Sequence, residues 1–195
     1  MTTSNPAAGR QCLLDQAREL FFEHGYHGVS VRDIVQACGL SNAALYHHFG
    51  SKQNLFVAVF KEHLATVARQ LQEAGTGMGS CRERLARMVG AHVRFILESR
   101  TEMQTLHRDL MQCDLEVIRH LLPDARRLIP SLFATVLEEG IVSGEIRPVD
   151  THRVSAMLLG MTSSLSFRRF HDNVTEPLAV DVDLAISTLF DGISV

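Results

Sequence analysis

The segment from Ser41 to Lys52 reads SNAALYHHFGSK and gathers hydrogen-bonding side chains with almost no charge. An imidazole can bind a metal, transfer a proton or hydrogen-bond to a partner. Neighbouring residues on a helix diverge by about 100°, whereas a metal site on one helix needs ligands three or four residues apart. His47 and His48 therefore do not form a metal-binding pair, and each must act separately.

The predicted helix over this segment has one apolar side and one polar side. Leu45 and Phe49 are four residues apart and are expected to point together into the protein. Alanine methyls allow close approach to thymine methyls, and tyrosine and histidine can donate hydrogen bonds to phosphate oxygens. The opposite side is therefore suited to the major groove of DNA, and it consists of Ala43, Ala44, Tyr46 and His47.

Three further side chains extend this polar side. Asn42 can read adenine through two hydrogen bonds, and Arg32 can reach a guanine or a phosphate. Lys52 and the free N–H groups of the next helix can hold a phosphate. Each residue alone is equally compatible with a solvated position, but the array on one side favours DNA binding. The predicted DNA contacts are Arg32, Ser41, Asn42, Ala43, Ala44, Tyr46, His47 and Lys52.

Helical signals in the first third of the chain explain how this array is positioned. Ser30 and Asp33 resemble a capping box, and Ser41 and Ser51 precede two further predicted helices. Gly39 interrupts the chain between the first two of these helices. Two short helices joined by a glycine-containing turn indicate a helix-turn-helix over about residues 30–49. An earlier amphipathic helix is predicted from Leu13, Leu14, Ala17, Leu20 and Phe21.

The remainder of the chain also reads as helix. The GTGMG segment at 75–79 is the clearest internal linker, and a long fourth helix from about residue 52 to 73 precedes it. Capping boxes at Ser80–Glu83 and Thr101–Gln104 and a cap at Asp150 begin later helices. Strand signals are nearly absent, so the sequence predicts an all-α fold of about nine helices.

Three motifs resemble the tetracycline-repressor (TetR/AcrR) family: GYHGVSVRDI at 25–34, ACGLS at 37–41 and LYHHFGSKQNL at 45–55. The resemblance covers about residues 10–60. It implies a homodimer with a DNA-binding domain at residues 8–52 and a ligand-binding and dimerisation domain at residues 53–195. Tyr46, His47 and Lys52 match the family's phosphate-contacting positions, and Arg32, Asn42 and Ala43 match positions used near bases. The Ala43–Ala44 pair departs from the pattern by leaving fewer polar side chains for base reading.

Two sets of residues are predicted for the C-terminal part. Apolar stripes on the last two helices predict a two-fold dimer interface of Val154, Leu158, Met161, Leu165, Leu184, Ile186, Leu189 and Phe190. Flexible methionines beside histidines predict a pocket for a small hydrophobic or amphipathic ligand. Its residues are Met88, His92, Phe95, Ile96, Met103, His107, Met111, Phe133 and Leu137. A filled core is the alternative for both sets.

Composition excludes several other classes. The chain has 195 residues, 46% of them hydrophobic, a net charge of −3 and no apolar run of membrane-spanning length or secretory signal, so a cytoplasmic location is expected. No catalytic motif, cofactor motif or metal site is predicted. The expected function is a ligand-responsive repressor that binds a palindromic operator as a homodimer and is released by a small-molecule inducer. A metal- or redox-responsive regulator and a transcriptional activator are the alternatives.

Overall fold

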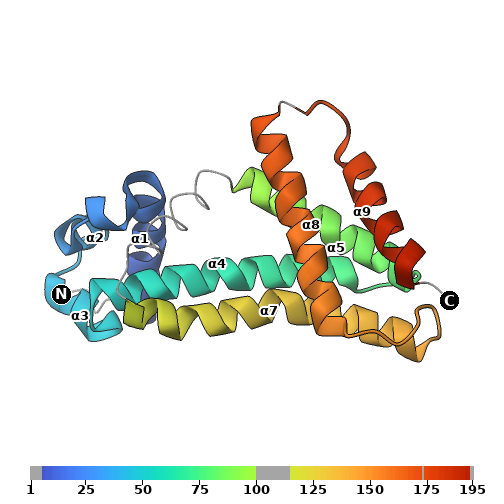
Figure 1. Ribbon diagram of the computed structural model, residues 1–195. Coiled ribbons are helices and arrows are strands. Elements are labelled where there is room, and N and C mark those ends of the chain that lie inside the picture. The colour runs from blue at the N-terminus through green and yellow to red at the C-terminus, as the bar shows by residue number, and fades with distance from the viewer. Residues whose placement is uncertain (1–5, 100–114, 173, 194–195) are drawn as a thin grey trace. The chain divides into compact units, whose positions relative to one another are not determined.

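A computed structural model of the protein describes the backbone of residues 6–99, 115–172 and 174–193. These ranges hold eight α-helices and no β-strand, so the predicted all-α fold is confirmed (Figure 1). Among the described residues, 6–64 and 115–123 form one compact unit, and 65–99 with 124–193 form a second. No helix in the described ranges is long and apolar enough to cross a lipid bilayer.

The first unit contains α1 (Pro6–Gly28), α2 (Val31–Ala37), α3 (Asn42–Phe49) and the first half of α4 (Lys52–Gly75). All three predicted caps are present. Ser30 Oγ accepts from the backbone N–H of Asp33 at 3.2 Å, and the Asp33 carboxylate accepts from Ser30 N–H at 2.7 Å. Ser41 and Ser51 each accept a hydrogen bond from the N–H three residues later. These serines fix where α2, α3 and α4 begin.

Two glycines make the sharp turns on either side of α3. Gly39 has a φ of 64° and Gly50 a φ of 75°. This left-handed region is costly for residues with a Cβ atom, and glycine adopts it freely. The short α3 is therefore bounded by a glycine turn at each end, and the sequence predicts the first of these turns, at Gly39.

Aromatic and apolar side chains hold α1 to α4 within the first unit. The rings of Phe21 and Phe56 meet edge to face with centroids 5.4 Å apart, and Tyr26 lies 5.0 Å from Phe56. Arg18 of α1 pairs with Glu62 of α4 at 2.8 Å. The helix-turn-helix thus packs on a rigid support whose fully buried residues include Leu13, Ala17, Phe21, Ile34, Leu45, Leu55, Phe56 and Val59.

The second unit contains the end of α4, α5 (Cys81–Glu98), most of α7 (Leu115–Val142), α8 (Thr151–His171) and α9 (Leu178–Ile193). The predicted capping box of Ser80 and Glu83 begins α5, and Asp150 caps α8. The predicted box at Thr101–Gln104 lies outside the described residues. A single apolar core joins these helices and includes Leu71, Leu85, Val89, Phe133, Leu137, Leu158, Ile186 and Phe190.

The start of α5 and the end of α7 approach each other closely. A Cβ atom on Gly140 would lie only 2.7 Å from Cys81 Sγ, too close for real atoms. The Cys81 thiol donates to the Val136 carbonyl at 3.4 Å, and Cys81 N–H donates to Glu145 at 2.7 Å. Glycine at position 140 therefore permits a contact that the next larger residue would prevent.

A buried carboxylate joins the end of α8 to the start of α9. Asp181 is 3% exposed and accepts from Arg168 at 2.5 Å and from Arg169 at 2.7 Å. Two cations thus compensate for removing this carboxylate from water. The pairing fixes the two last helices as one hairpin.

Candidate nucleic-acid interface

The orientation of α3 agrees with the sequence prediction. Leu45 is fully buried and Phe49 nearly so, whereas Tyr46 is 51% exposed. Ala43 and His47 are also exposed, and Ala44 is partly exposed. Helical periodicity thus presents small and polar side chains to solvent and anchors the opposite side in the core.

The adjacent histidines diverge as predicted. The ring centroids of His47 and His48 are 5.3 Å apart with planes inclined by 62°, and His48 also lies 6.4 Å from the Phe49 ring. His47 is exposed, whereas His48 is half-buried. The described residues contain no group of three or more potential metal ligands, and this includes the surroundings of both rings.

Lys52 is held in place by an aromatic ring that the sequence prediction overlooked. Its ammonium lies 4.2 Å from the centroid of the Tyr26 ring, within the range of a cation–π interaction. Lys52 is the first residue of α4 and is half-buried. Tyr26 therefore restricts the position of a cation beside the free N–H groups of a helix N-terminus, where an anion is favoured.

A second overlooked residue is Arg10, near the start of α1. Its guanidinium carbon lies 5.0 Å from the centroid of the Phe49 ring, at the end of α3. Arg10 is exposed, so it adds a positive charge beside the recognition segment. The contact depends on the packing of α1 against α3, and no local pattern in the sequence indicates it.

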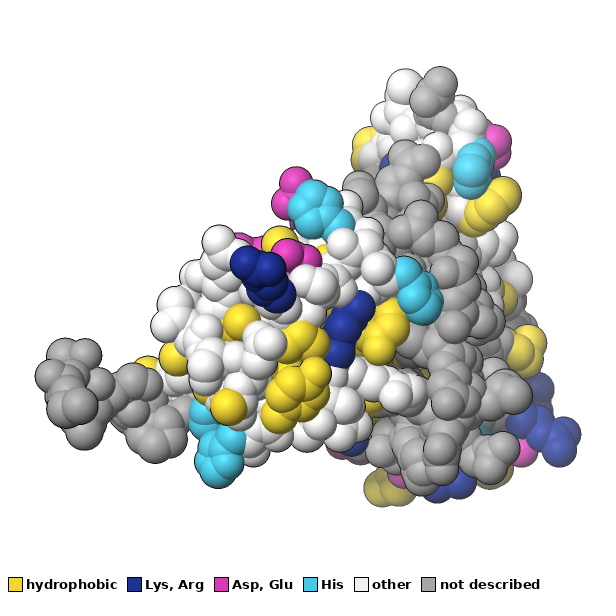
Figure 2. Space-filling view, turned by 90° about the vertical axis from the view of Figure 1, so that its left-hand side faces the viewer, with side chains coloured by type: hydrophobic (Ala, Val, Ile, Leu, Met, Phe, Trp, Pro, Cys, Tyr) yellow, Lys and Arg dark blue, Asp and Glu magenta, His cyan; other side chains and the backbone are white. Residues whose placement is uncertain are grey.

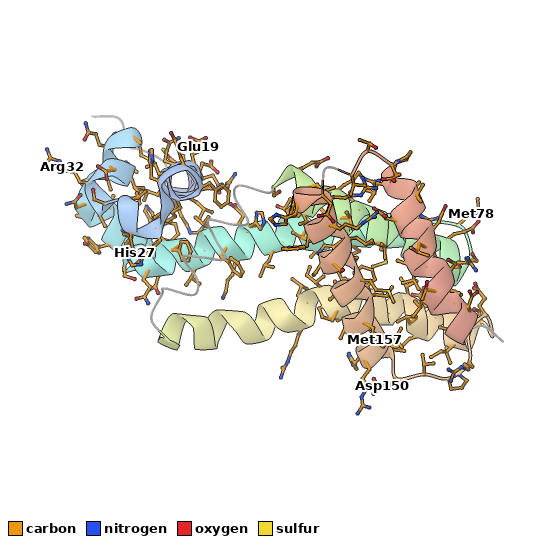
Figure 3. The ribbon with its side chains drawn as sticks, turned by 45° about the horizontal axis from the view of Figure 1, so that its top comes forward. Glu19, His27, Arg32, Met78, Asp150 and Met157 are labelled. Atoms are coloured by element: carbon orange, nitrogen blue, oxygen red, sulfur yellow. The ribbon has the colours of Figure 1, made fainter. Side chains whose placement is uncertain are left out.

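Arg32 is exposed on α2 and points away from the helices of its unit (Figure 3). Its neighbour Asp33 is committed to the helix cap, where hydrogen bonds from Ser30 lower the pKa of the carboxyl below its usual value. In Figure 2, basic and histidine side chains are spread over one face of the first unit, with acidic side chains towards its upper edge. This face offers donors and cations to a polyanion.

Comparison with known proteins identifies the family. Residues 13–59 match the family described as bacterial regulatory proteins, tetR family. Residues 78–167 match the tetracyclin repressor-like C-terminal domain. The chain belongs to the tetR family. The resemblance predicted from the motifs around α2 and α3 is thereby confirmed, and it extends to the C-terminal part, where no motif indicated it.

Individual tetR-family relatives match to different extents. The HTH-type transcriptional repressor AcnR of Corynebacterium glutamicum is 46% identical over 70 residues, which span 36% of this chain and only 37% of that repressor. The fatty acid metabolism regulator protein of Bacillus subtilis is 25% identical over 149 residues, 76% of each chain. A crystal structure of FadR from Bacillus subtilis in complex with stearoyl-CoA has the same fold, with a TM-score of 0.75, 22% identity, and coverage of 94% of this chain and 98% of that one.

Those predicted pocket residues of this tetR-family chain that the structure describes all lie in the second unit. Met88, Phe95, Phe133 and Leu137 are buried in its core, and His92 and Ile96 are half-buried. Met103, His107 and Met111 lie outside the described residues. A surface groove of about 480 Å³ between α5 and α9 contains none of these residues and is lined by Arg82, Glu83, Ala86, Asp183, Leu184, Ile186 and Ser187.

His92 is the polar member of the predicted pocket set. Its Nδ1 lies 3.1 Å from Thr162 Oγ1, and the Thr162 hydroxyl donates to the Leu159 carbonyl at 2.9 Å. The hydroxyl can therefore only accept from the ring, which places the imidazole proton on Nδ1. Burial lowers the pKa of His92 to about 4, so the ring is neutral at physiological pH.

Most of the predicted dimer residues lie inside the second unit, and the two-fold interface stays a prediction. Val154, Leu158, Ile186, Leu189 and Phe190 are buried within the single chain, where they pack in the core of the second unit. Met161 and Leu165 are partly buried, and only Leu184 is largely exposed. The stripes chosen from sequence therefore face mainly inward, because both helices carry apolar residues on more than one side. Their large exposed apolar residues are Met157, Phe167, Val180 and Leu184.

Proposed function

We propose that this tetR-family regulator is a cytoplasmic, ligand-responsive transcriptional repressor that binds a palindromic operator as a homodimer. The outward side of α3, with exposed Tyr46 and His47 beside a positioned Lys52, is the observation that carries this proposal. The similarity of residues in this part of the chain to the repressor AcnR supports repression. Binding of a small molecule releases the operator.

The side chains around α3 divide into two roles. Tyr46, His47 and Lys52 contact phosphates, which position the protein without reading sequence. Asn42, at the start of α3, and Arg32, on α2, contact base edges. Ser41 caps α3, and Ala43 and Ala44 let the helix approach the groove closely.

Substitutions at these positions are expected to separate the two roles. Lys52→Ala should weaken binding about equally on all DNA sequences and reduce the dependence of log K on log salt by roughly one phosphate. Tyr46→Phe should likewise weaken binding without changing sequence preference. Asn42→Ala and Arg32→Ala should change preference by about 1–3 kcal/mol for each lost bidentate contact. Fluorescence anisotropy with a palindrome selected from random DNA, over a series of salt concentrations, measures both effects.

Lys61→Ala is the matched control, because Lys61 is an exposed cation on the same helix as Lys52 but about two and a half turns further along. It should leave the selected sequence preference unchanged and affect affinity less than Lys52→Ala does. Wild-type affinity and preference in all four variants at Arg32, Asn42, Tyr46 and Lys52 would show that DNA binds elsewhere.

The ligand site proposed for this function surrounds His92 in the second unit. With the proton on Nδ1, His92 Nε2 presents a lone pair, so a ligand that donates an N–H or O–H would be oriented by the ring. Buried apolar neighbours such as Phe133, whose ring centroid lies 6.4 Å from that of His92, favour a hydrophobic or amphipathic molecule. The FadR complex with stearoyl-CoA shows that a protein of this fold accommodates such a ligand.

Ligand binding is expected to shift a conformational equilibrium and lower operator affinity by about 1–3 kcal/mol. A library of apolar and amphipathic metabolites is screened for compounds that raise the melting temperature and release operator DNA. His92→Leu and Phe95→Ala should alter the response to such a compound and leave ligand-free DNA binding intact. A wild-type response in both variants would place the ligand elsewhere in the protein.

A further inference from the structure

A buried arginine near the end of α8 carries a hydrogen-bond donor that the fold does not use. Arg169 Nε donates to Asp181 Oδ2 at 2.7 Å, and the Arg169 side chain is only 11% exposed. Nη2 of the same guanidinium is buried as well, and it has no hydrogen-bond partner in the described parts of the chain. Buried polar groups in native proteins are nearly always hydrogen-bonded, so this donor calls for an acceptor from another molecule.

The charges around this donor do not balance either. Asp181 also accepts from Arg168, so two guanidinium groups share a single carboxylate. Asp181 lies in the first turn of α9, where the helix N-terminus adds a partial positive charge. A water molecule would accept from Nη2 and leave the excess charge in place. An oxyanion would satisfy the donor and compensate the charge together.

Helical spacing connects this donor to the ligand site proposed around His92. Thr162, which contacts His92, is seven residues from Arg169, so Thr162 and Arg169 lie on nearly the same side of α8, about 10 Å apart along its axis. Thr162 and Ser166 on this side are buried, so the side faces the interior of the second unit. An extended chain advances about 1.2 Å per bond, and an alkyl chain of about eight bonds therefore spans this distance.

We propose that Arg169 binds the anionic headgroup of the regulatory ligand, a carboxylate or phosphate on an apolar chain. The link to regulation rests on the proposed function, whereas binding of the oxyanion does not. Nη2 is enclosed in the folded chain, so a headgroup reaches it only in a conformer whose α8–α9 hairpin has opened beside Asp181. Ligand binding therefore favours that conformer, and a population shift of this kind is what release of DNA requires.

Calorimetric titration of the full chain with decanoate, decyl phosphate and n-decanol tests this assignment, because the three probes share one apolar chain and differ in the headgroup. Wild type should bind at least one of the two anions at least about tenfold more tightly than n-decanol, as expected for a hydrogen bond between charged groups. Comparison of the two anions shows whether the site takes a carboxylate or a phosphate. The anion that binds more tightly should also release a palindrome selected with wild-type protein.

Variants at the two ends of the ion pair should have opposite effects. Arg169→Gln should abolish the preference for the anions and leave the affinity for n-decanol unchanged. Asp181→Asn should increase the preference, because it removes the carboxylate that competes with the ligand for both arginines. A purely structural role of the pair would instead weaken the binding of all three probes in both variants.

Two further variants guard against effects on folding. Arg169→Gln combined with Asp181→Asn removes both charges of the pair, which avoids an uncompensated buried carboxylate, and it should also lack the preference. Arg153→Gln is the matched control and should retain the preference. Arg153 is an exposed arginine at the start of α8 that likewise pairs with an aspartate, Asp150, at 3.0 Å. Circular dichroism confirms that each variant is folded.

The outcomes separate this site from the proposed function. The proposal would be overturned if wild type bound the anions no more tightly than n-decanol, if it bound none of the probes, or if the preference survived in Arg169→Gln. Binding of an anion without release of DNA would overturn its regulatory role. If the chain bound no DNA at all, the proposed function would fail, while calorimetry would still decide whether Arg169 binds an oxyanion.

Discussion

The double substitution Met157→Glu with Phe167→Glu is expected to give a folded monomer that binds operator DNA at least about 100-fold more weakly. Both side chains are largely exposed on α8, at 57% and 65%, although both are apolar. Between them on the same side lies Gly160, beside which a Cβ atom would meet nothing within 4 Å. A small residue between two exposed apolar residues allows another helix to approach closely, which fits the proposed two-fold interface.

The expected loss of affinity follows from the linkage of two DNA-reading units. A dimer binds the second half-site at a high effective concentration, which commonly adds a factor of about 10²–10⁴ to the affinity. Light scattering measures the oligomeric state, and anisotropy measures operator binding. Val142→Glu is the matched control, because Val142 is an apolar residue 89% exposed on α7 and should change neither quantity.

Leu158→Glu provides the contrast on the buried side of α8. Leu158 is fully buried in the single chain, so a carboxylate there should unfold the second unit rather than release a folded monomer. A dimer that persists in the Met157 and Phe167 variant would exclude this surface. If Leu158→Glu gave a folded monomer instead, this result would support the interface predicted from the sequence, which includes Leu158.

Acidification from about pH 6.5 to 4 is expected to lower the free energy of unfolding of the second unit by about 3 kcal/mol through His92 alone. Burial lowers the pKa of His92 from 6.5 to about 4 in the folded chain. The unfolded chain therefore takes up a proton at a higher pH than the folded chain does. The contribution of neutral His92 to the free energy of unfolding is complete above the unfolded-state pKa. It declines as the pH falls and is lost once the pH passes below the folded-state pKa.

His92→Asn isolates this contribution. Asparagine keeps an N–H donor near the position of Nδ1 for Thr162 and does not titrate in this range. Hydrogen exchange in α5 and α8, measured between pH 7.5 and 4, reports the free energy of opening of the second unit. This free energy should fall with pH in both proteins, and the fall should be about 3 kcal/mol smaller in the variant than in wild type. Burial also lowers the pKa of His63, in the first unit, so the variant and wild type must be compared within the second unit. If the opening free energies of wild type and His92→Asn changed with pH in the same way, His92 would not be a neutral buried residue in the folded chain.

Features that depend on neighbouring residues were predictable from the sequence. The caps at Ser30, Ser41 and Ser80 each require only a hydroxyl and an N–H three residues later, and all are present. The inward direction of Leu45 and Phe49 follows from helical periodicity, because α3 has a single apolar side. The all-α fold and the orientation of the predicted recognition helix therefore follow from local rules.

Features that depend on packing between distant segments were not predictable. In α8, Leu158 and Phe167 are both apolar, and only the tertiary structure shows that Leu158 is buried in the core and Phe167 is exposed to solvent. The contacts of Lys52 with Tyr26 and of Arg10 with Phe49 likewise join separate elements. Periodicity identifies apolar sides and gives no information about which side a partner helix will cover.

The contact between Cys81 and Gly140 has a consequence for how this sequence can change. A methyl group at position 140 would overlap the Cys81 sulfur, at 2.7 Å, and also its Cβ atom, at 2.9 Å. Alanine at position 81 would remove the first overlap and leave the second, and only glycine there would remove both. Any other residue at position 81 requires a change in the helix backbones before alanine fits at position 140. Relatives that carry a larger residue at position 140 should therefore differ in the spacing of these two helices, and positions 81 and 140 should evolve as one unit.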